Sequence, residues 1–91
     1  MAIVTKKLTV KNKSGLHARP AALFVQIANK FDSRITVKRD DDQEEVNGKS
    51  IMGILMLGAE KGSVIVIEAE GDDADSAMLE LEKIILSEEE I

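Results

Sequence analysis

Polar and apolar residues alternate at the start of the chain in the pattern of a half-buried strand. Over Ile3–Val10, Val4 and Leu8 alternate with polar positions, and Lys6 is the one exception. The loop Lys11–Leu16 follows. The beginning of the chain therefore predicts one strand that buries one of its faces.

Apolar residues then recur three and four positions apart, which is the spacing of a helix with one buried face. Within Ala18–Phe31 this spacing is carried by Phe24, Ile27, Ala28 and Phe31. Pro20 fits the first turn of such a helix, because its fixed φ suits helical geometry and its missing N–H has no acceptor there. We therefore expect an amphipathic helix over this segment.

The middle of the chain predicts a hairpin and then a short helix. Alternation over Arg34–Arg39, a polar turn at residues 40–42 and a return at Glu44–Asn47 indicate two paired strands. Ser50–Leu57 is apolar almost throughout and contains Gly53, which favours a short helix over a strand.

The last third of the chain predicts a central strand and a final helix. Val64–Ala69 contains four consecutive β-branched residues, a pattern typical of the centre of a sheet. Gly71 ends this strand, and Asp72 or Asp73 is placed to cap the helix that follows. The apolar face of that helix comprises Ala74, Ala77, Leu81, Ile84 and Ile85.

The predicted order of elements is βαββαβα, within one domain that covers residues 1–91. A chain of 91 residues has room for a single shared core. Helices packed on one face of an antiparallel sheet are the natural two-layer solution for such an α+β pattern. Taken alone, the order of elements suggests a ferredoxin-like relative.

Charge is distributed unevenly along the chain. The net charge is −5, which argues against a nucleic acid as the main partner. Residues 1–39 nevertheless carry nine Lys and Arg against one acid, whereas residues 40–91 carry three against sixteen. Such polarity can steer an acidic protein partner towards one face; the alternative is that the two halves of the sequence do not form two separate surfaces.

The N-terminal residues lack the long apolar run and the small-residue cleavage site of a signal peptide. The longest mainly apolar stretch, Ile51–Ala59, is much shorter than the ~20 residues of a membrane span. We therefore expect a cytoplasmic protein that does not insert into membranes.

The only histidine of the chain, His17, lies where a loop turns into the first predicted helix. A helix N-terminus presents unpaired N–H groups and a positive dipole end to a phosphate. Imidazole is both a nucleophile and a leaving group, and Arg19 is placed to neutralise phosphoryl oxygens. No Ser or Cys triad is indicated, and one histidine with scattered carboxylates specifies no metal site. The alternative is a solvated or capping histidine without chemistry.

Two motifs resemble the signatures of the HPr phosphocarrier family. Residues 15–21, Gly-Leu-His-Ala-Arg-Pro-Ala, resemble its phosphorylation-site signature, and residues 47–53, Asn-Gly-Lys-Ser-Ile-Met-Gly, resemble its second signature. The resemblance covers essentially the whole chain. It implies an open-faced β-sandwich, with three helices on one face of a four-stranded antiparallel sheet ordered 1-4-2-3, in place of the ferredoxin-like arrangement.

The resemblance also implies a role in the phosphoenolpyruvate-dependent sugar phosphotransferase system. His17 would accept a phosphoryl group from phospho-Enzyme I and pass it to sugar-specific IIA components, assisted by Arg19. The protein would be a carrier rather than an enzyme, with no cofactor and no metal. It is expected to be a monomer, because transient exchange requires modest interfaces.

Further residues receive roles from the same resemblance. Ser50 matches the site that an HPr kinase/phosphorylase phosphorylates in many family members, and serine also suits N-capping of the short helix. A docking patch for partners would consist of Ala18, Ile51, Met52 and Leu55. Apolar surface with an adaptable methionine suits a carrier that binds unlike proteins.

Two alternatives remain open. A regulatory paralogue of the catabolite-repression type would signal through phospho-Ser50 and act mainly by protein binding. A carrier of a nitrogen-related phosphotransferase branch would keep the chemistry and change the pathway. The hairpin at residues 38–46 is longer and more acidic than is usual in the family, and no function is assigned to it.

Overall fold

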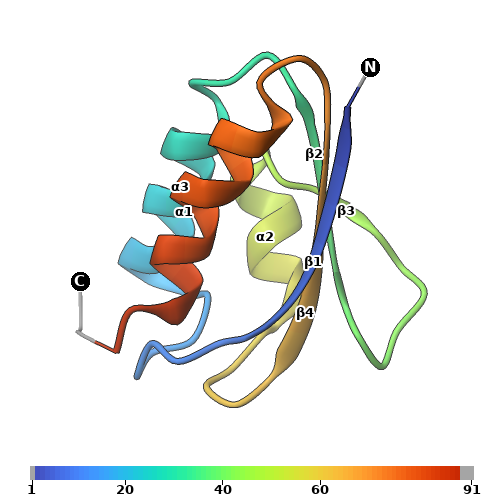
Figure 1. Ribbon diagram of the computed structural model, residues 1–91. Helices are drawn as coiled ribbons and strands as arrows, with labels where there is room; N and C mark the ends of the chain where they lie inside the picture. The colour runs from blue at the N-terminus through green and yellow to red at the C-terminus, as the bar shows by residue number, and fades with distance from the viewer. Residues whose placement is uncertain (1, 89–91) are drawn as a thin grey trace.

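The computed structural model describes residues 2–88 and confirms the predicted order of elements (Figure 1). The elements are β1 (Ile3–Thr9), α1 (Ala18–Ala28), β2 (Arg34–Arg39), β3 (Val46–Asn47), α2 (Ile51–Leu57), β4 (Val64–Glu70) and α3 (Ala74–Leu86). None of the helices in this part of the chain is long and apolar enough to cross a membrane.

The four strands form one antiparallel sheet in the order β1-β4-β2-β3. This order confirms the arrangement that the family resemblance implies, and it corrects the ferredoxin-like suggestion. β4 occupies the central position that its β-branched residues predict, since Ile67 pairs with Lys6 of β1 on one side and with Val37 of β2 on the other. β-branched side chains pack well against neighbours on both sides of a pleated surface.

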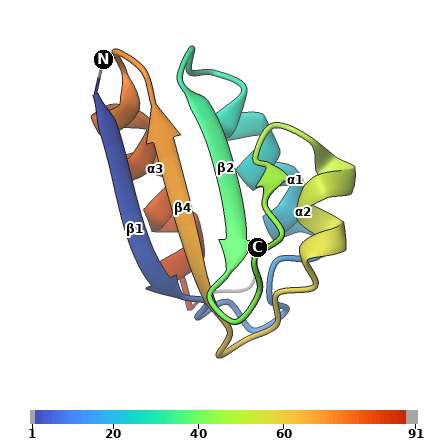
Figure 2. The ribbon, with the colours of Figure 1, turned by 90° about the vertical axis from the view of Figure 1, so that its right-hand side faces the viewer.

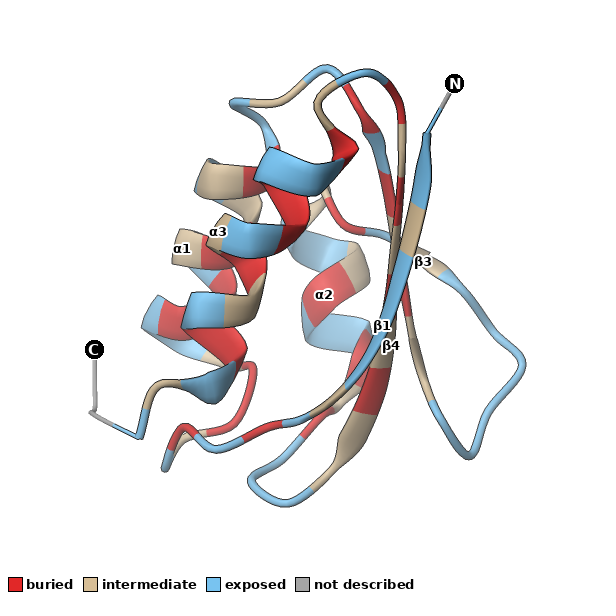
Figure 3. Ribbon diagram, viewed as in Figure 1, coloured by how far each residue is buried: buried red, intermediate tan, exposed pale blue. Residues whose placement is uncertain are grey.

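All three helices cover the same face of the sheet, and the opposite face is open (Figures 1 and 2). Along β4, Ile65, Ile67 and Ala69 are buried beneath the helices, whereas the residues between them are only partly buried. Figure 3 shows buried positions recurring along the helices and along β4, while β1 at the edge is mostly exposed.

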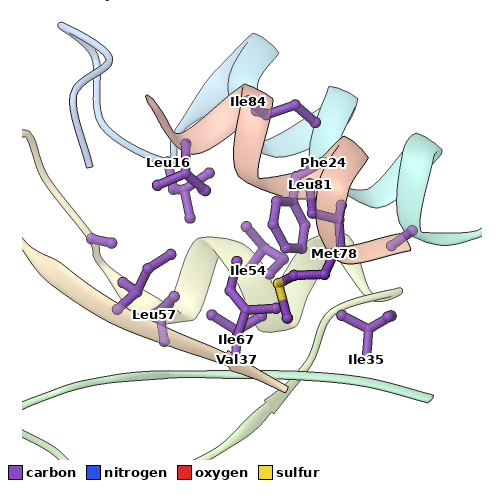
Figure 4. Close-up of a cluster of buried hydrophobic side chains, with 14 of the residues drawn as sticks. Leu16, Phe24, Ile35, Val37, Ile54, Leu57, Ile67, Met78, Leu81 and Ile84 are labelled. Carbon is purple, nitrogen blue, oxygen red and sulfur yellow. The ribbon is translucent and has the colours of Figure 1, made fainter. Parts of the chain in front are cut away.

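The core between the two layers consists of aliphatic side chains around one buried aromatic ring. Phe24 of α1 lies with Met78 and Leu81 of α3 above Val37 and Ile67 of the sheet (Figure 4). All five side chains are at most 1% exposed. Close packing of this kind fixes the position of α1 on the sheet, and therefore also the loop that leads into it.

α1 ends at Ala28, three residues before the predicted end at Phe31. Asn29 follows as the C-cap, and its Nδ2 donates to the carbonyl oxygens of Val25 (2.9 Å) and Lys49 (3.2 Å). The second bond joins the end of α1 to the residue before Ser50, the N-cap of α2. The spacing of apolar residues along a helix cannot predict such a tertiary contact. Phe31 still packs against the core, which explains why the apolar spacing extends past the helix.

β3 covers only Val46–Asn47, whereas the sequence predicted a strand over Glu44–Asn47. Residues 40–45 are all exposed and form a loop that projects away from the sheet (Figure 1). This acidic segment has no apolar side chain to bury, so pairing with β2 begins only at Val46, which packs against the core.

Two ion pairs hold the base of this acidic loop. Arg39 donates from Nε and Nη2 to the carboxylate of Asp41, at 3.0 Å for each bond, and these bonds hold the pKa of Asp41 below its usual range. Lys7 of β1 lies 3.2 Å from Asp40. Basic residues of the first half of the chain are thus paired here with acids of the second half, so the charge asymmetry of the sequence is partly neutralised at this end of the sheet.

Asp73 occupies the N-cap position of α3, but its side chain does not cap that helix. The carboxylate accepts hydrogen bonds from the N–H groups of Asp32 (2.8 Å) and Ser33 (2.9 Å), and from the Ser33 hydroxyl. Gly71 allows the close approach, because a Cβ there would lie 2.6 Å from Oγ of Ser33. Asp73 therefore joins the turn after β4 to the connection between α1 and β2.

We expect Asp73→Asn to lower the melting temperature by several degrees at neutral pH and to have no effect in strong acid. The hydroxyl of Ser33, followed by the N–H of Asp32, holds the pKa of Asp73 below its ordinary value of 3.8. The stabilisation is therefore complete above the carboxyl's unfolded pKa and is lost as the pH falls through the lower folded pKa.

Thermal melts of both proteins from neutral pH to about pH 2 measure this effect, with the exposed Asp72→Asn as the matched control. A difference between wild type and Asp73→Asn that persists undiminished in strong acid would contradict the role given to the carboxylate.

Candidate functional site

His17 occupies the N-cap position of α1, at the lower end of that helix in Figure 1. Its backbone is extended, with φ −127° and ψ 163°, and its carbonyl oxygen accepts the N–H of Ala21. The side chain is partly exposed, and the imidazole has no hydrogen-bond partner within residues 2–88. Neither ring nitrogen is therefore occupied by a hydrogen bond within this part of the chain.

The start of α1 favours negative charge. Its first turn contains no acidic residue, and the N–H groups at a helix start have no intrahelical acceptors. Arg19 is exposed and forms no ion pair with any described residue. Pro20 is buried in the first turn, as expected. A phosphoryl group on His17 would thus lie at the positive end of α1, with the free guanidinium of Arg19 two residues away in the chain.

The chain just before His17 is held by the loop that follows α2. Leu16 is 1% exposed, and its N–H donates to the carbonyl oxygen of Ala59 (2.8 Å). Gly15 has a φ of +68°, and a Cβ at this position would lie 2.6 Å from the same oxygen. Glycine is required here for both its conformation and its size.

Ala18 carries backbone strain directly after His17. Its φ is +49°, and it is the one described residue other than glycine with a positive φ. This conformation costs an L-residue about 1–2 kcal/mol. Such strain persists only where the surrounding structure holds it, and here the neighbours Leu16 and Pro20 are both buried.

Ala18→Gly should raise the free energy of unfolding by about 1 kcal/mol, because glycine adopts a positive φ without a steric penalty. Ala22→Gly, at an exposed position of the same helix, is the control and should lower it by about 1 kcal/mol. Urea titration of the three proteins measures both changes. Equal losses of stability in the two variants would show that the strain at Ala18 is absent.

Ser50 is the N-cap of α2, and its Oγ accepts a hydrogen bond from the N–H of Gly53 (3.2 Å). The expected capping role is therefore confirmed. Beside it, Nζ of Lys49 donates to the carbonyl oxygen of Phe31, which follows α1 (2.7 Å). The start of α2 thus meets the end of α1, while the end of α2 leads to the loop that holds the chain before His17 (Figure 2). Ser50 and His17 consequently lie at opposite ends of an antiparallel helix pair.

α2 exposes the apolar surface that its sequence predicts. Four of its large side chains are at least 39% exposed, and we call them the α2 patch: Ile51, Met52, Leu55 and Met56. Ile54 and Leu57 of the same helix are buried. Ala18, at the start of the neighbouring α1, is also exposed. Contiguous exposed apolar side chains are typical of protein interaction surfaces.

A family model described as the PTS HPr component phosphorylation site matches residues 4–87. The chain belongs to the HPr family. HPr proteins are phosphocarriers of the phosphotransferase system, and they are not enzymes in their own right. The match includes both motifs that the sequence analysis singled out.

Individual HPr family members are similar over most of their length. The HPr-like protein Crh of Halalkalibacterium halodurans is 50% identical over 76 residues, which cover 84% of this chain and 88% of that protein. The crystal structure of the phosphocarrier protein HPr from Bacillus anthracis superposes with a TM-score of 0.87 at 47% identity, covering 93% of this chain and 99% of that one. The crystal structure of Bacillus subtilis Crh, described as a swapped dimer, has a TM-score of 0.73 at 41% identity, covering 93% and 95%.

The sequence predicted roles for His17 and Arg19, but it did not predict the contacts that hold the loop before them in this HPr protein. Asn12 was placed in a plain loop, yet it is 1% exposed. An Asn two residues before a Ser-Gly pair is a turn signal, and this signal could have indicated that Asn12 shapes the loop. Ala59 lies outside both motifs, and only the fold brings it to Leu16.

Among the described residues, no group of three or more His, Asp or Glu is arranged to hold a metal ion.

Proposed function

We propose that this HPr protein carries a phosphoryl group on His17 from phospho-Enzyme I to the IIA components of sugar permeases, and that it does so in the cytoplasm. The observation that supports this most is the position of the imidazole, partly exposed and without a hydrogen-bond partner at the start of α1. Arg19 is exposed beside it in the sequence, in a chain that the family model matches over residues 4–87.

The chemistry is a transfer between two nucleophiles. The unprotonated Nδ1 of His17 attacks phosphorus, a new N–P bond forms, and the bond between phosphorus and Enzyme I breaks. A nucleophile of the IIA component then attacks the same phosphorus, and the imidazole leaves. Arg19 and the N–H groups at the start of α1 stabilise the charge on the phosphoryl oxygens in both steps.

Partners dock on the α2 patch and on Ala18, the residue that follows the histidine. Exposed apolar side chains supply contact area, and two methionines in the patch adapt to unlike partner surfaces. The positive start of α1 favours partners with acidic surfaces. These contacts position the donor or the acceptor phosphorus next to the ring.

Ser50 is proposed as a regulatory site for an HPr kinase/phosphorylase. Phosphate on its Oγ would lie at the start of α2, where the helix dipole tolerates it, and would add negative charge beside the α2 patch. Because Ser50 and His17 lie at opposite ends of the helix pair, this charge would act on the docking of partners rather than on the imidazole itself.

The experiment that tests the proposed function is incubation of the purified protein with phosphoenolpyruvate and Enzyme I. We expect one phosphoryl group, stable in alkali and labile in acid, mapped by mass spectrometry to the peptide that contains His17. A IIA component added afterwards should remove it. Absence of phosphorylation, or an acid-stable phosphate on another peptide, would overturn the proposal.

A regulatory role of the Crh type is the second candidate, and the 50% identity to Crh of H. halodurans favours it. The presence of His17 counts against it. Phosphorylation on Ser50 by kinase and ATP, together with none on His17 by Enzyme I, would replace the first proposal with this one.

We further propose that the working form is a monomer. A sedimentation coefficient of a dimer at micromolar concentration would refute this.

A further inference from the structure

We propose that Asn12 is a positioning residue for phosphoryl transfer at His17, an inference that rests on the proposed function. Asn12 lies five residues before the histidine, in the loop between β1 and α1. It is one of two buried polar residues among those that the structure describes, and it is 1% exposed. A buried amide in a connecting loop costs free energy unless its hydrogen bonds are made, so its bonds indicate what it is for.

Asn12 closes a turn with both its side chain and its backbone. Oδ1 accepts the N–H of Ser14 (3.1 Å), and the carbonyl oxygen accepts the N–H of Gly15 (3.0 Å). A side-chain oxygen that accepts the N–H two residues ahead mimics a backbone turn, which is why asparagine is favoured in such positions. The two bonds together determine the path of residues 12–15.

This turn is connected to two other elements of the fold. On one side, the N–H of Lys11 donates to the carbonyl oxygen of Ile85 in α3 (3.0 Å). On the other side, the N–H of Leu16 donates to Ala59 (2.8 Å), and the side chain of Leu16 enters the core. With both ends held, the shape of the turn determines the direction in which the chain leaves Leu16, and therefore where His17 lies.

The imidazole itself has no hydrogen-bond partner among the described residues, so no hydrogen bond to a neighbouring side chain orients it. Its position relative to an incoming phosphorus is therefore set by the backbone. Reacting atoms must approach to about 3–3.5 Å with correct alignment, and a displacement of ~1 Å can reduce the rate about a hundredfold. The strained φ of Ala18 also requires a rigid chain before it. Asn12 supplies that rigidity, although it does not touch the reacting atoms.

Two substitutions that keep the number of side-chain heavy atoms distinguish this role from simple space filling. Asn12→Leu removes the acceptor, whereas Asn12→Asp keeps an oxygen that can accept the N–H of Ser14. In single-turnover transfer from phospho-Enzyme I, we expect Asn12→Leu to lower the maximal rate about tenfold. The concentration of carrier at half-maximal rate should stay within about twofold of wild type, because the α2 patch is unchanged. Asn12→Asp should retain more of the rate than Asn12→Leu, because its Oδ1 can still accept the N–H of Ser14.

Asp73→Asn is the control for lost stability, because Asp73 holds the connection at the far end of α1 from His17. It should melt at a lower temperature and still transfer at the wild-type rate. If Asn12→Leu does not fold, Asn12→Ser tests the same point. Serine forms the turn more weakly, so its rate should fall below that of Asn12→Asp.

The inference fails if Asn12→Leu transfers as fast as wild type, if the aspartate and leucine variants lose rate equally, or if a folded serine variant matches the aspartate variant. These outcomes are distinct from failure of the proposed function, which would appear as a wild-type protein that accepts no phosphoryl group on His17.

Discussion

Replacing His17 with alanine should reduce phosphoryl acceptance from phospho-Enzyme I by at least about a thousandfold, because the reacting nucleophile is removed and the chain has no second histidine. Folding should be almost unchanged, within about 0.5 kcal/mol, since the side chain is partly exposed and its ring has no hydrogen-bond partner among the described residues. Rapid-quench measurement of the phosphorylated carrier, with an equilibrium unfolding curve for each protein, separates these two quantities.

Two further variants make the result specific to the imidazole. His17→Gln keeps a polar side chain of similar reach but has no nucleophilic nitrogen, so it should be as inactive as the alanine variant. Ser50→Ala removes a cap from α2, which costs about 1 kcal/mol, but leaves the histidine in place and should accept phosphoryl normally. Alkali-stable phosphate that persists in both His17 variants would show that the acceptor is elsewhere.

Gly15→Ala should be among the most destabilising single-methyl additions in this protein, at a cost of about 2–5 kcal/mol. About 1–2 kcal/mol comes from placing an L-residue at φ +68°. A further 1–3 kcal/mol comes from overpacking, because the new Cβ would lie 2.6 Å from the carbonyl oxygen of Ala59 and 2.8 Å from Cα of Glu60. Both are backbone atoms, so they cannot move aside as the end of a side chain would.

Gly58→Ala provides the matched control for that substitution. Gly58 has a φ of +63°, close to that of Gly15, but a Cβ there would meet no atom within 4 Å. This variant should therefore lose only the conformational part, about 1–2 kcal/mol. Urea unfolding of the two variants measures the difference. Equal losses would mean that the added Cβ at Gly15 is accommodated without overpacking against the loop after α2.

Local patterns predicted most helices and strands of the fold because burial against one layer leaves a period of two or of about three and a half residues in the sequence. Their ends were less well predicted. The apolar spacing of α1 extended to Phe31 because that ring is packed in the core, although the helix itself stops at Ala28. The strand expected over Glu44–Asn47 begins only at Val46, because the acidic Glu44 and Glu45 have no buried face.

The capping residues also show that local contacts were predicted from the sequence and distant contacts were not. Ser50 was expected to cap the short helix, and it does, because an N-cap bond joins residues three apart and is readable from a short segment. Asp72 or Asp73 was expected to cap α3 in the same way; Asp73 occupies the N-cap position, but its carboxylate accepts from Asp32 and Ser33, some forty residues earlier in the chain. Rules for capping use neighbouring residues only, so they cannot predict that the carboxylate of Asp73 accepts from distant N–H groups instead of from those of its own helix.

The motifs around His17 and Ser50 were sufficient to predict the family, the helix start that carries the histidine and the exposed apolar face of α2, because each depends on residues close together in the chain. Other features depend on segments that are far apart in the chain and meet only when the two layers pack. They are the pairing of β1 with β4, the hydrogen bond from Leu16 to Ala59 and the burial of Asn12. Side-chain periodicity says which face of an element is buried but not which distant segment buries it. Only the tertiary structure therefore decided how the loop before His17 is held.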